Sequence, residues 1–145
     1  MVGSVIISRF VNERIWRLKC VESQDCDGDY YFLVGLVSTQ TDHTKTERPL
    51  SLFGYGYDAF DGDVSPAGHY DAAVDEIRVP KVGDILSIKY ETIEESSGNV
   101  HGKMMFYIND KQIKAYFNNI KISNGETYRF GVSFHGAGDT IQLLH

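Results

Sequence analysis

"GKMMFYINDKQIKAYF", residues 102–117, places two apolar segments on either side of an Asn-Asp-Lys sequence. In the first segment Met104, Phe106 and Ile108 occupy alternate positions, which is the period of a β-strand with one buried face. Asn and Asp tolerate left-handed backbone angles, so Asn109–Lys111 predicts a tight turn into the second segment. The stretch therefore predicts a β-hairpin.

The same alternation continues toward the N-terminus. The segment Arg14–Glu22 alternates Trp, Leu and Cys with Arg and Lys, which predicts a half-buried strand. Tyr30–Ser38 is apolar on both faces and predicts a strand in the interior of a sheet, with Gly35 at a close backbone approach or a bulge. Val82–Thr92 alternates again and predicts another strand.

Nearly all of the apolar segments are predicted strands, and only His69–Ile77 has the composition of a helical turn. Further strands are predicted at Thr127–Phe134 and Thr140–Leu144, joined by a glycine-rich turn. Many short strands and few helices predict an all-β sandwich. A chain of 145 residues buries roughly 70% of its unfolded surface. Since it also lacks internal repeats, we expect a single domain, residues 1–145.

The composition excludes several classes of partner. The formal net charge is −6, and the Lys and Arg residues are scattered singly, which argues against nucleic acid or an anionic membrane. Cys20 and Cys26 are the only cysteines, and their spacing does not resemble the disulfide framework of a small secreted module. The sequence shows no signal peptide and no long apolar run, so we expect a cytoplasmic protein.

The stretch SLFGYGYDAFDGDVSPAGHYD, residues 51–71, is open to three interpretations. The first is a loop that binds phosphate, because Gly54 and Gly56 resemble the start of a glycine-rich phosphate loop. Ala59 stands at the third glycine position of that motif, however, and no helix is predicted after it. The other two interpretations are a calcium loop and a strand that runs into an aromatic recognition loop.

A calcium loop needs about six to eight oxygen ligands. Asp-Gly-Asp occurs at residues 27–29 and 61–63, and three alternating aspartates from Asp25 resemble the beginning of an EF-hand loop. Tyr30 stands where that loop has its glycine, and Leu36 stands where it has its glutamate. We therefore interpret both Asp-Gly-Asp sequences as exposed turns, and we expect no metal and no cofactor.

The five histidines are far apart, and no motif of a nucleophile or of metal ligands surrounds them. We expect no catalytic residue and no enzymatic activity. A cluster of His69 and Asp71 with a serine stays open, because catalytic triads are recognised by their geometry and not by their spacing in the sequence.

A series of short motifs runs through the second half of the chain. It consists of a Gly-Asp pair before a strand, an aromatic hairpin strand that ends in Asn, a Phe-Asn pair, and two final strands around a glycine-rich turn. These motifs lie at Gly83–Asp84, Phe106–Asn109, Phe117–Asn118 and Val132–Leu144. Together with the earlier segments IWRLKCVE, LVGLVS and LFGYGYD, they resemble the SPRY domain family from about Ile15 onward.

Two positions depart from the family pattern. Asp110 replaces the glycine that usually follows the Asn of the hairpin, which is a mild change because either residue suits the turn. Tyr90 and Glu91 stand where the family usually has an aspartate.

The resemblance implies a bent, antiparallel two-sheet β-sandwich without catalytic activity, whose loops at one edge bind a short peptide segment of a partner. Phe134, His135 and Gly136 match the place where family members present a bulky residue beside a glycine to the ligand. In the family, the long polar loop at residues 39–49 borders the same surface. This loop adds three candidate residues, His43, Lys45 and Arg48.

Under this interpretation Leu50–Tyr57 is a strand that leads into a loop from Asp58 to Tyr70. Tyrosine suits a recognition surface because it offers a large rigid area and a hydroxyl group at low entropic cost. We therefore include Tyr55 and Tyr57 among the peptide-binding residues, and expect one ring to point inward and the other outward. Four further residues are expected in the core: Trp16, Gly35, Phe106 and Ile108.

The favoured function is that of a protein-interaction module with a protein or peptide partner. The alternative is a carbohydrate-binding, lectin-like sandwich. It requires an exposed tyrosine or Trp16 that stacks on a sugar ring, with Asp or Asn beside it and calcium at one Asp-Gly-Asp sequence. A third hypothesis makes the domain part of a larger multidomain chain, in which it targets an attached catalytic unit.

Overall fold

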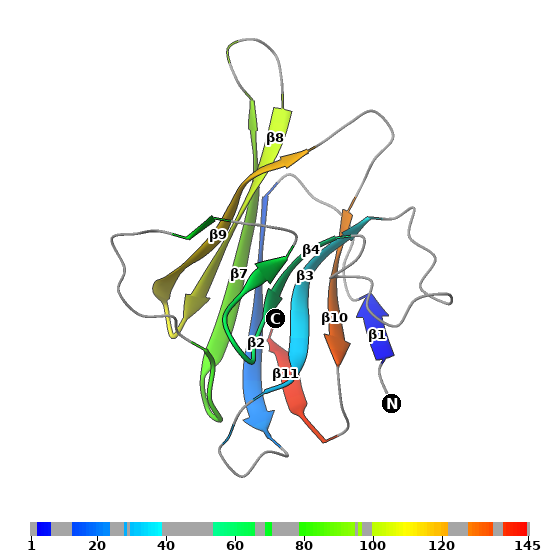
Figure 1. Ribbon diagram of the computed structural model, residues 1–145, viewed down its shortest axis with the longest axis vertical. Helices are drawn as coiled ribbons and strands as arrows, with labels where there is room; N and C mark the ends of the chain where they lie inside the picture. The colour runs from blue at the N-terminus through cyan, green and yellow to red at the C-terminus, as the bar shows by residue number, and fades with distance from the viewer. Residues whose placement is uncertain are drawn as a thin grey trace.

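The computed structural model describes residues 3–6, 13–23, 28, 30–38, 54–65, 69–70, 79–94, 96, 100–121, 128–134 and 138–144. These residues form two β-sheets in which every pair of neighbouring strands is antiparallel (Figure 1). Within this part of the chain, no helix is long and apolar enough to cross a membrane. The predicted all-β, two-sheet sandwich is confirmed.

The smaller sheet, sheet A, has five strands. In spatial order they are β1 (Gly3–Ile6), β10 (Tyr128–Phe134), β3 (Phe32–Ser38), β4 (Gly54–Asp58) and β5 (Val64–Ser65). The strand predicted at Tyr30–Ser38 is thus β3, and its place between β10 and β4 agrees with a sequence that is apolar on both faces.

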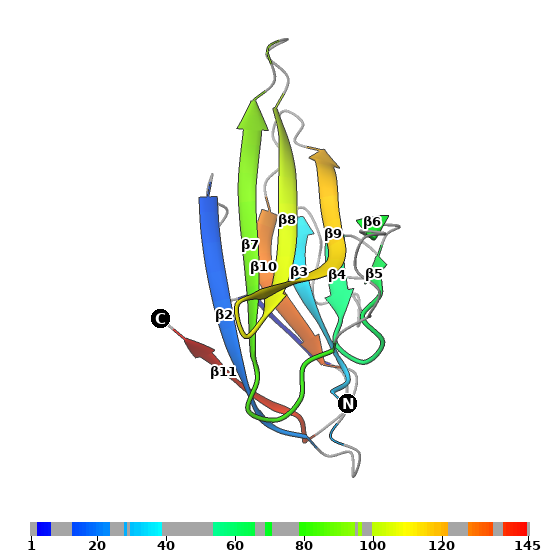
Figure 2. The ribbon, with the colours of Figure 1, turned by 90° about the vertical axis from the view of Figure 1, so that its left-hand side faces the viewer.

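The larger sheet, sheet B, has six strands. In spatial order they are β11 (Thr140–Leu144), β2 (Glu13–Glu22), β7 (Ile85–Glu94), β8 (Val100–Ile108), β9 (Lys111–Lys121) and β6 (His69–Tyr70). Figure 2 shows the two layers, with β7 and β8 of sheet B in front of β10 and β3 of sheet A.

The core lies between the sheets and is built from the alternate residues that the sequence predicts. On β2, Trp16 is 4% exposed, and the two apolar residues that follow it on the same face are also buried. Its ring stacks on Phe130 of sheet A at 4.5 Å. Phe106 of sheet B is fully buried and stacks on Tyr57 of sheet A at 4.9 Å. Such pairs contribute about 0.5–1.5 kcal/mol each beyond the burial of their area.

The close approach predicted at Gly35 occurs between β3 and β4. A Cβ atom on Gly35 would overlap the carbonyl oxygen of Tyr55 and lie 3.0 Å from the Cα atom of Gly56. Gly35 and Gly56 are register partners, so two glycines face each other across the strand pair. Only glycine fits at this point of β3.

The predicted hairpin is formed by β8 and β9, with Asn109 and Asp110 at its turn. Both have left-handed backbone angles, with φ of 50° and 67°. Two consecutive positive φ angles are typical of the turns that match the twist of a hairpin. Asn109 and Asp110 thus adopt the left-handed conformation although neither is a glycine, as the sequence predicts.

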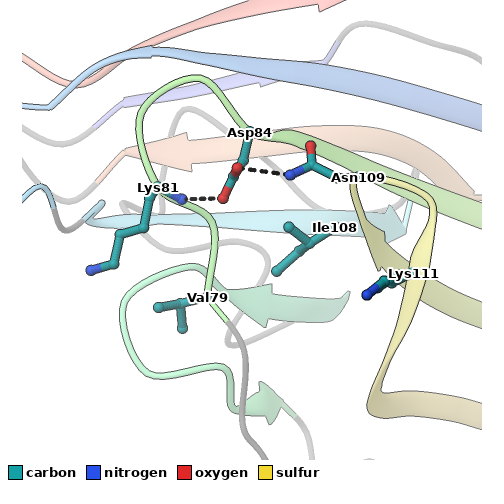
Figure 3. Close-up of a pocket in the computed structure, with 6 residues that line it drawn as sticks. All are labelled: Val79, Lys81, Asp84, Ile108, Asn109 and Lys111. Carbon is teal, nitrogen blue, oxygen red and sulfur yellow. Dashed lines mark hydrogen bonds between the residues drawn. The ribbon is translucent and has the colours of Figure 1, made fainter.

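The Gly-Asp motif and the Asn of the hairpin contact each other (Figure 3). The Asp84 carboxylate accepts hydrogen bonds from the Lys81 backbone N–H at 2.9 Å and from Nδ2 of Asn109 at 2.8 Å. Oδ1 of Asn109 accepts a hydrogen bond from the Ile85 N–H at 2.9 Å. This arrangement fixes the beginning of β7 against the β8–β9 turn, and it gives a structural reason for both motifs.

Three local predictions need correction. The predicted loop Asp58–Tyr70 contains the two short strands β5 and β6, which pair with β4 and β9. Val82 lies in the turn before β7, which begins at Ile85, and it is 54% exposed. The helical turn predicted at His69–Ile77 begins instead with β6, and its residues 71–77 lie outside the described part of the chain, as do residues 50–53 of the predicted strand.

Candidate functional site

The first predicted site residue, Phe134, is the last residue of β10, where it pairs with Phe32 of β3. Its half-buried ring packs against the core at 6.0 Å from the ring of Phe32. His135 and Gly136 follow directly and lie outside the described residues. The structure therefore places the beginning of this predicted site at the end of sheet A where β3 starts, which we call the β3-start end.

The second predicted group, His43, Lys45 and Arg48, also lies outside the described residues. The ends of its loop are visible at Ser38 and Gly54. Ser38 is six residues further along β3 than Phe32, or about 20 Å at the usual rise of a strand. The two ends of this loop thus leave sheet A far from Phe134.

Tyr55 and Tyr57 both turn toward the core. Tyr57 is fully buried, while Tyr55 is half-buried and packs edge-on against Phe117 and Tyr128 at 5.3 and 5.8 Å. The expectation that one ring points inward and the other outward is wrong, because residues two apart on a strand share a face. Tyr57 offers no side-chain surface to a partner, which removes it from the candidate contact residues.

The exposed aromatic surface at the β3-start end is instead formed by Tyr31 and Phe60. Their side chains are 37% and 45% exposed, and the rings stack at 4.8 Å with an interplanar angle of 18°. Large apolar groups that stay in water as a pair are typical of contact surfaces.

Backbone hydrogen bonds hold both residues of this pair. The Tyr31 N–H donates to Oδ2 of Asp139 at 2.7 Å, and the Phe60 N–H donates to Oδ1 of Asp58 at 2.9 Å. The N–H of Ala59 donates to the carbonyl of Phe32 at 2.9 Å, which joins the turn after β4 to β3. The pair is therefore positioned before a ligand arrives.

The turn that carries Phe60 also contains the second Asp-Gly-Asp sequence. Gly62 has a φ of 79°, and the carboxylate of Asp61 accepts a hydrogen bond from the N–H of Asp63 at 2.9 Å. Among the described residues, no group of three or more His, Cys, Asp or Glu side chains is arranged to hold a metal ion. Residues 61–63 form a turn in which both aspartates are exposed, whereas residues 27 and 29 are not described.

Two carboxylates, Asp84 and Asp139, lie close to the buried Cys20 and Tyr30 near this end. The neighbouring carboxylates of Asp84 and Asp139 add to the effect of burial on Cys20, and together they raise the pKa of its thiol to about 12. Burial is also the main cause that raises the pKa of the Tyr30 hydroxyl to about 12. The neighbouring Cys20 thiol has the next largest effect, followed by the carboxylates of Asp139 and Asp84. Cys20 is thus a buried thiol.

The sequence contained a signal for each residue of the pair. Tyr31 lies between the two fully buried residues Tyr30 and Phe32, so alternation places it on the opposite face of the strand. Phe60 is a large apolar residue within the polar turn sequence DAFDGD. That the two rings meet depends on how the turn after β4 packs beside β3, and the sequence does not give this.

A hollow of about 450 Å³ lies beside the Asp84–Asn109 contact, and Figure 3 shows the residues that line it. The carboxylate of Asp84 and the side-chain amide of Asn109 already bond each other and the adjacent backbone. We assign these polar groups a structural role. The residues drawn in the figure are Val79, Lys81, Asp84, Ile108, Asn109 and Lys111.

Among solved structures, the chain is similar to the crystal structure of a human SPRY domain, with a TM-score of 0.64. The similarity covers 98% of this chain and 83% of that chain, at 19% sequence identity. No protein-family model and no curated protein sequence matches the chain. The fold is therefore SPRY-like, as the sequence motifs predict.

Proposed function

We propose that this chain is a non-catalytic protein-interaction module that binds a short, extended peptide at the β3-start end of the sandwich. The SPRY-like fold supports an interaction module. The single observation that carries the position of the site is the exposed, stacked pair Tyr31–Phe60. It lies at the same end of sheet A as Phe134, after which His135 and Gly136 continue the chain.

The pair is suited to peptide binding for two reasons. Binding removes two partly exposed rings from water, and aromatic residues in such positions carry much of the energy of protein interfaces. Because hydrogen bonds already hold the backbone of both residues, little conformational entropy is lost when a ligand orders them.

The charge of this end indicates the chemistry of the peptide. Asp61 and Asp63 are exposed in the same turn as Phe60, and Asp139 holds the backbone of Tyr31. A Lys or Arg side chain stacks favourably on an aromatic ring and pairs with a nearby carboxylate. We therefore propose a peptide with at least one basic side chain, although the whole domain carries a net charge of −6 and attracts cations at longer range as well.

A second candidate function is carbohydrate binding, because Tyr31 is an exposed ring near exposed aspartates. Trp16 does not serve this function, since it is 4% exposed and stacks on Phe130 in the core. The remaining candidate ring, Tyr31, already stacks on Phe60 at 4.8 Å, which leaves one of its faces covered. These observations favour the peptide over the sugar.

A display library of random peptides and a glycan array, each with and without calcium, test the two candidates. The domains compared are the wild type, Tyr31→Ala, Phe60→Ala, His135→Ala and the control Val100→Ala. Val100 is 40% exposed and is the first residue of β8. In Figure 1, β8 begins at the opposite end of the molecule from the beginning of β3.

We expect a calcium-independent peptide motif that contains Lys or Arg. Phe60→Ala and Tyr31→Ala each weaken its binding about tenfold or more, as for residues at the centre of an interface. Val100→Ala leaves the affinity within twofold. Glycan binding that requires calcium, or equal losses in Phe60→Ala and Val100→Ala, would contradict the proposal.

A further inference from the structure

A second hollow lies on the outer face of sheet B, on the other side of the core from sheet A. Its volume is about 230 Å³, and it is formed over β2, β7 and β8. Arg17, Ser87 and Tyr107 are register partners across these three strands, so their side chains stand in one row. The described residues that line it are Ile15, Arg17, Ser87, Lys89, Tyr107 and Asp110.

Ser87 forms the floor of this pocket. It is 4% exposed, although it lies on the face of β7 that points away from the core residues Leu86 and Ile88. Within the described part of the chain, its hydroxyl group has no hydrogen-bond partner. A buried hydroxyl without a partner is unfavourable, which makes it a group that a ligand can satisfy.

The wall of the pocket is cationic. Arg17 is exposed and forms no ion pair with any described residue, while Lys89 lies 3.8 Å from Glu91. Among the described lining residues, the only carboxylate is that of Asp110, in the exposed hairpin turn. The surrounding outer face of sheet B adds two further basic residues, Lys19 on β2 and Lys103 on β8. Glu91 is the register partner of Lys103 and lies beside Lys89, so the basic excess around the pocket rests on Arg17 and Lys19.

An oxyanion satisfies both the guanidinium and the hydroxyl. Arg binds carboxylates and phosphates through two parallel N–H donors, and a serine hydroxyl can donate to the same group. The volume is smaller than that of pockets that enclose a whole small molecule, about 300–1,000 Å³. It suits one side chain, whose apolar stem packs between Ile15 and Tyr107.

We propose that this pocket binds one acidic side chain of a partner polypeptide, with its carboxylate or phosphate on Arg17 and on the hydroxyl group of Ser87. The site is independent of the peptide surface at Tyr31 and Phe60, because the two lie on different sheets. A chain that carries both sites contacts a basic segment at one surface and an acidic segment at the other.

Titration of the isotope-labelled domain by NMR tests this inference. The probes are acetyl-Glu-Glu-Glu-amide, acetyl-Glu-phosphoserine-Glu-amide, the neutral acetyl-Gln-Gln-Gln-amide and inorganic phosphate. The variants are Arg17→Gln, Ser87→Ala and the control Lys19→Gln. Lys19 lies on the same face of the same strand and undergoes the same loss of charge, but it does not line the pocket.

We expect saturable shifts at the amides of Arg17, Ser87 and Tyr107 with one or both acidic peptides, and none with the Gln peptide. Whichever acidic peptide binds more tightly identifies carboxylate or phosphate as the preferred group. Arg17→Gln weakens binding about tenfold or more and Ser87→Ala about fivefold, whereas Lys19→Gln changes it less than threefold. Ser87→Ala does not lower the urea midpoint of unfolding, because the hydroxyl has no partner to lose.

Several results would overturn the inference. Equal losses in Arg17→Gln and Lys19→Gln would mean diffuse attraction to the basic face and no pocket. The same conclusion follows if no acidic peptide binds at millimolar concentration, if the Gln peptide binds equally well, or if inorganic phosphate alone produces the shifts and neither acidic peptide does.

Discussion

Replacing Asn109 with alanine removes the contact between the Gly-Asp motif and the β8–β9 turn. The variant loses the hydrogen bond from the Ile85 N–H to Oδ1 and the bond from Nδ2 to the carboxylate of Asp84. It also places alanine at a φ of 50°, which Asn accepts more readily because its short polar side chain can hydrogen-bond locally. Asn109→Ala therefore destabilises the fold through two separate causes.

The magnitude follows from these causes. Each hydrogen bond contributes about 1 kcal/mol net to the free energy of unfolding, since the site is exposed and water can hydrogen-bond the groups that lose their partner. Alanine accepts the left-handed backbone angle less readily than Asn, which adds at most about 1 kcal/mol. We expect Asn109→Ala to lower the free energy of unfolding by roughly 2–3 kcal/mol. Asn109→Gly loses the same hydrogen bonds but accepts the backbone angle, so it recovers roughly 0.5–1 kcal/mol.

Urea unfolding followed by circular dichroism measures the stability of both variants. The slope of the free energy of unfolding against urea concentration should equal that of the wild type, since neither substitution is expected to change the surface exposed on unfolding. Asn119→Ala is the control, because Asn119 is exposed on β9 and makes no side-chain hydrogen bond among the described residues. We expect it to change stability by less than about 0.5 kcal/mol. The reasoning is refuted if Asn109→Ala matches this control, or if the glycine variant is as unstable as the alanine variant.

Two further predictions concern packing and pH. Gly35→Ala lowers the free energy of unfolding by more than about 3 kcal/mol, because its Cβ atom would overlap backbone atoms. Gly102→Ala lowers it by about 1–3 kcal/mol, because its Cβ atom meets the side chain of Tyr90, which can shift. Equal losses of the two variants in urea unfolding would contradict this explanation. Burial in the fold is the main cause that raises the pKa of Cys20, Tyr30 and Tyr90 to about 12. The unfolded chain releases these protons from about pH 9 upward, so stability is complete below that pH and falls toward pH 12. Thermal unfolding between pH 8 and 11 tests this: the melting temperature falls less steeply in Cys20→Ala, and a constant wild-type value would contradict it.

The strands with regular alternation could be predicted from the sequence. In the middle of β2 and β8, residues 16, 18 and 20 and residues 102, 104, 106 and 108 are buried, because one face of each strand packs on the core. The hairpin turn was also readable, since Asn and Asp at its centre accept positive φ angles. β5 and β6 were missed because two residues are too few to show a period.

The candidate sites were less accessible to prediction, because they depend on register and packing. Tyr31 and Phe60 come from separate segments, and Arg17, Ser87 and Tyr107 meet only because three strands pair in one register. The prediction for Tyr55 and Tyr57 failed for a different reason, since their spacing of two residues already placed both rings on one face.

The most direct test of the account is an NMR shift map of the labelled domain with a peptide selected from the library. We predict that the largest amide shifts occur at Tyr31, Phe60 and Phe134 and at the residues that follow Phe134. In the same spectra, the amides on the outer face of sheet B around Ser87 should shift much less than these. Shifts confined to the opposite end of sheet A, near Ser38 and Gly54, would contradict the proposed position of the peptide.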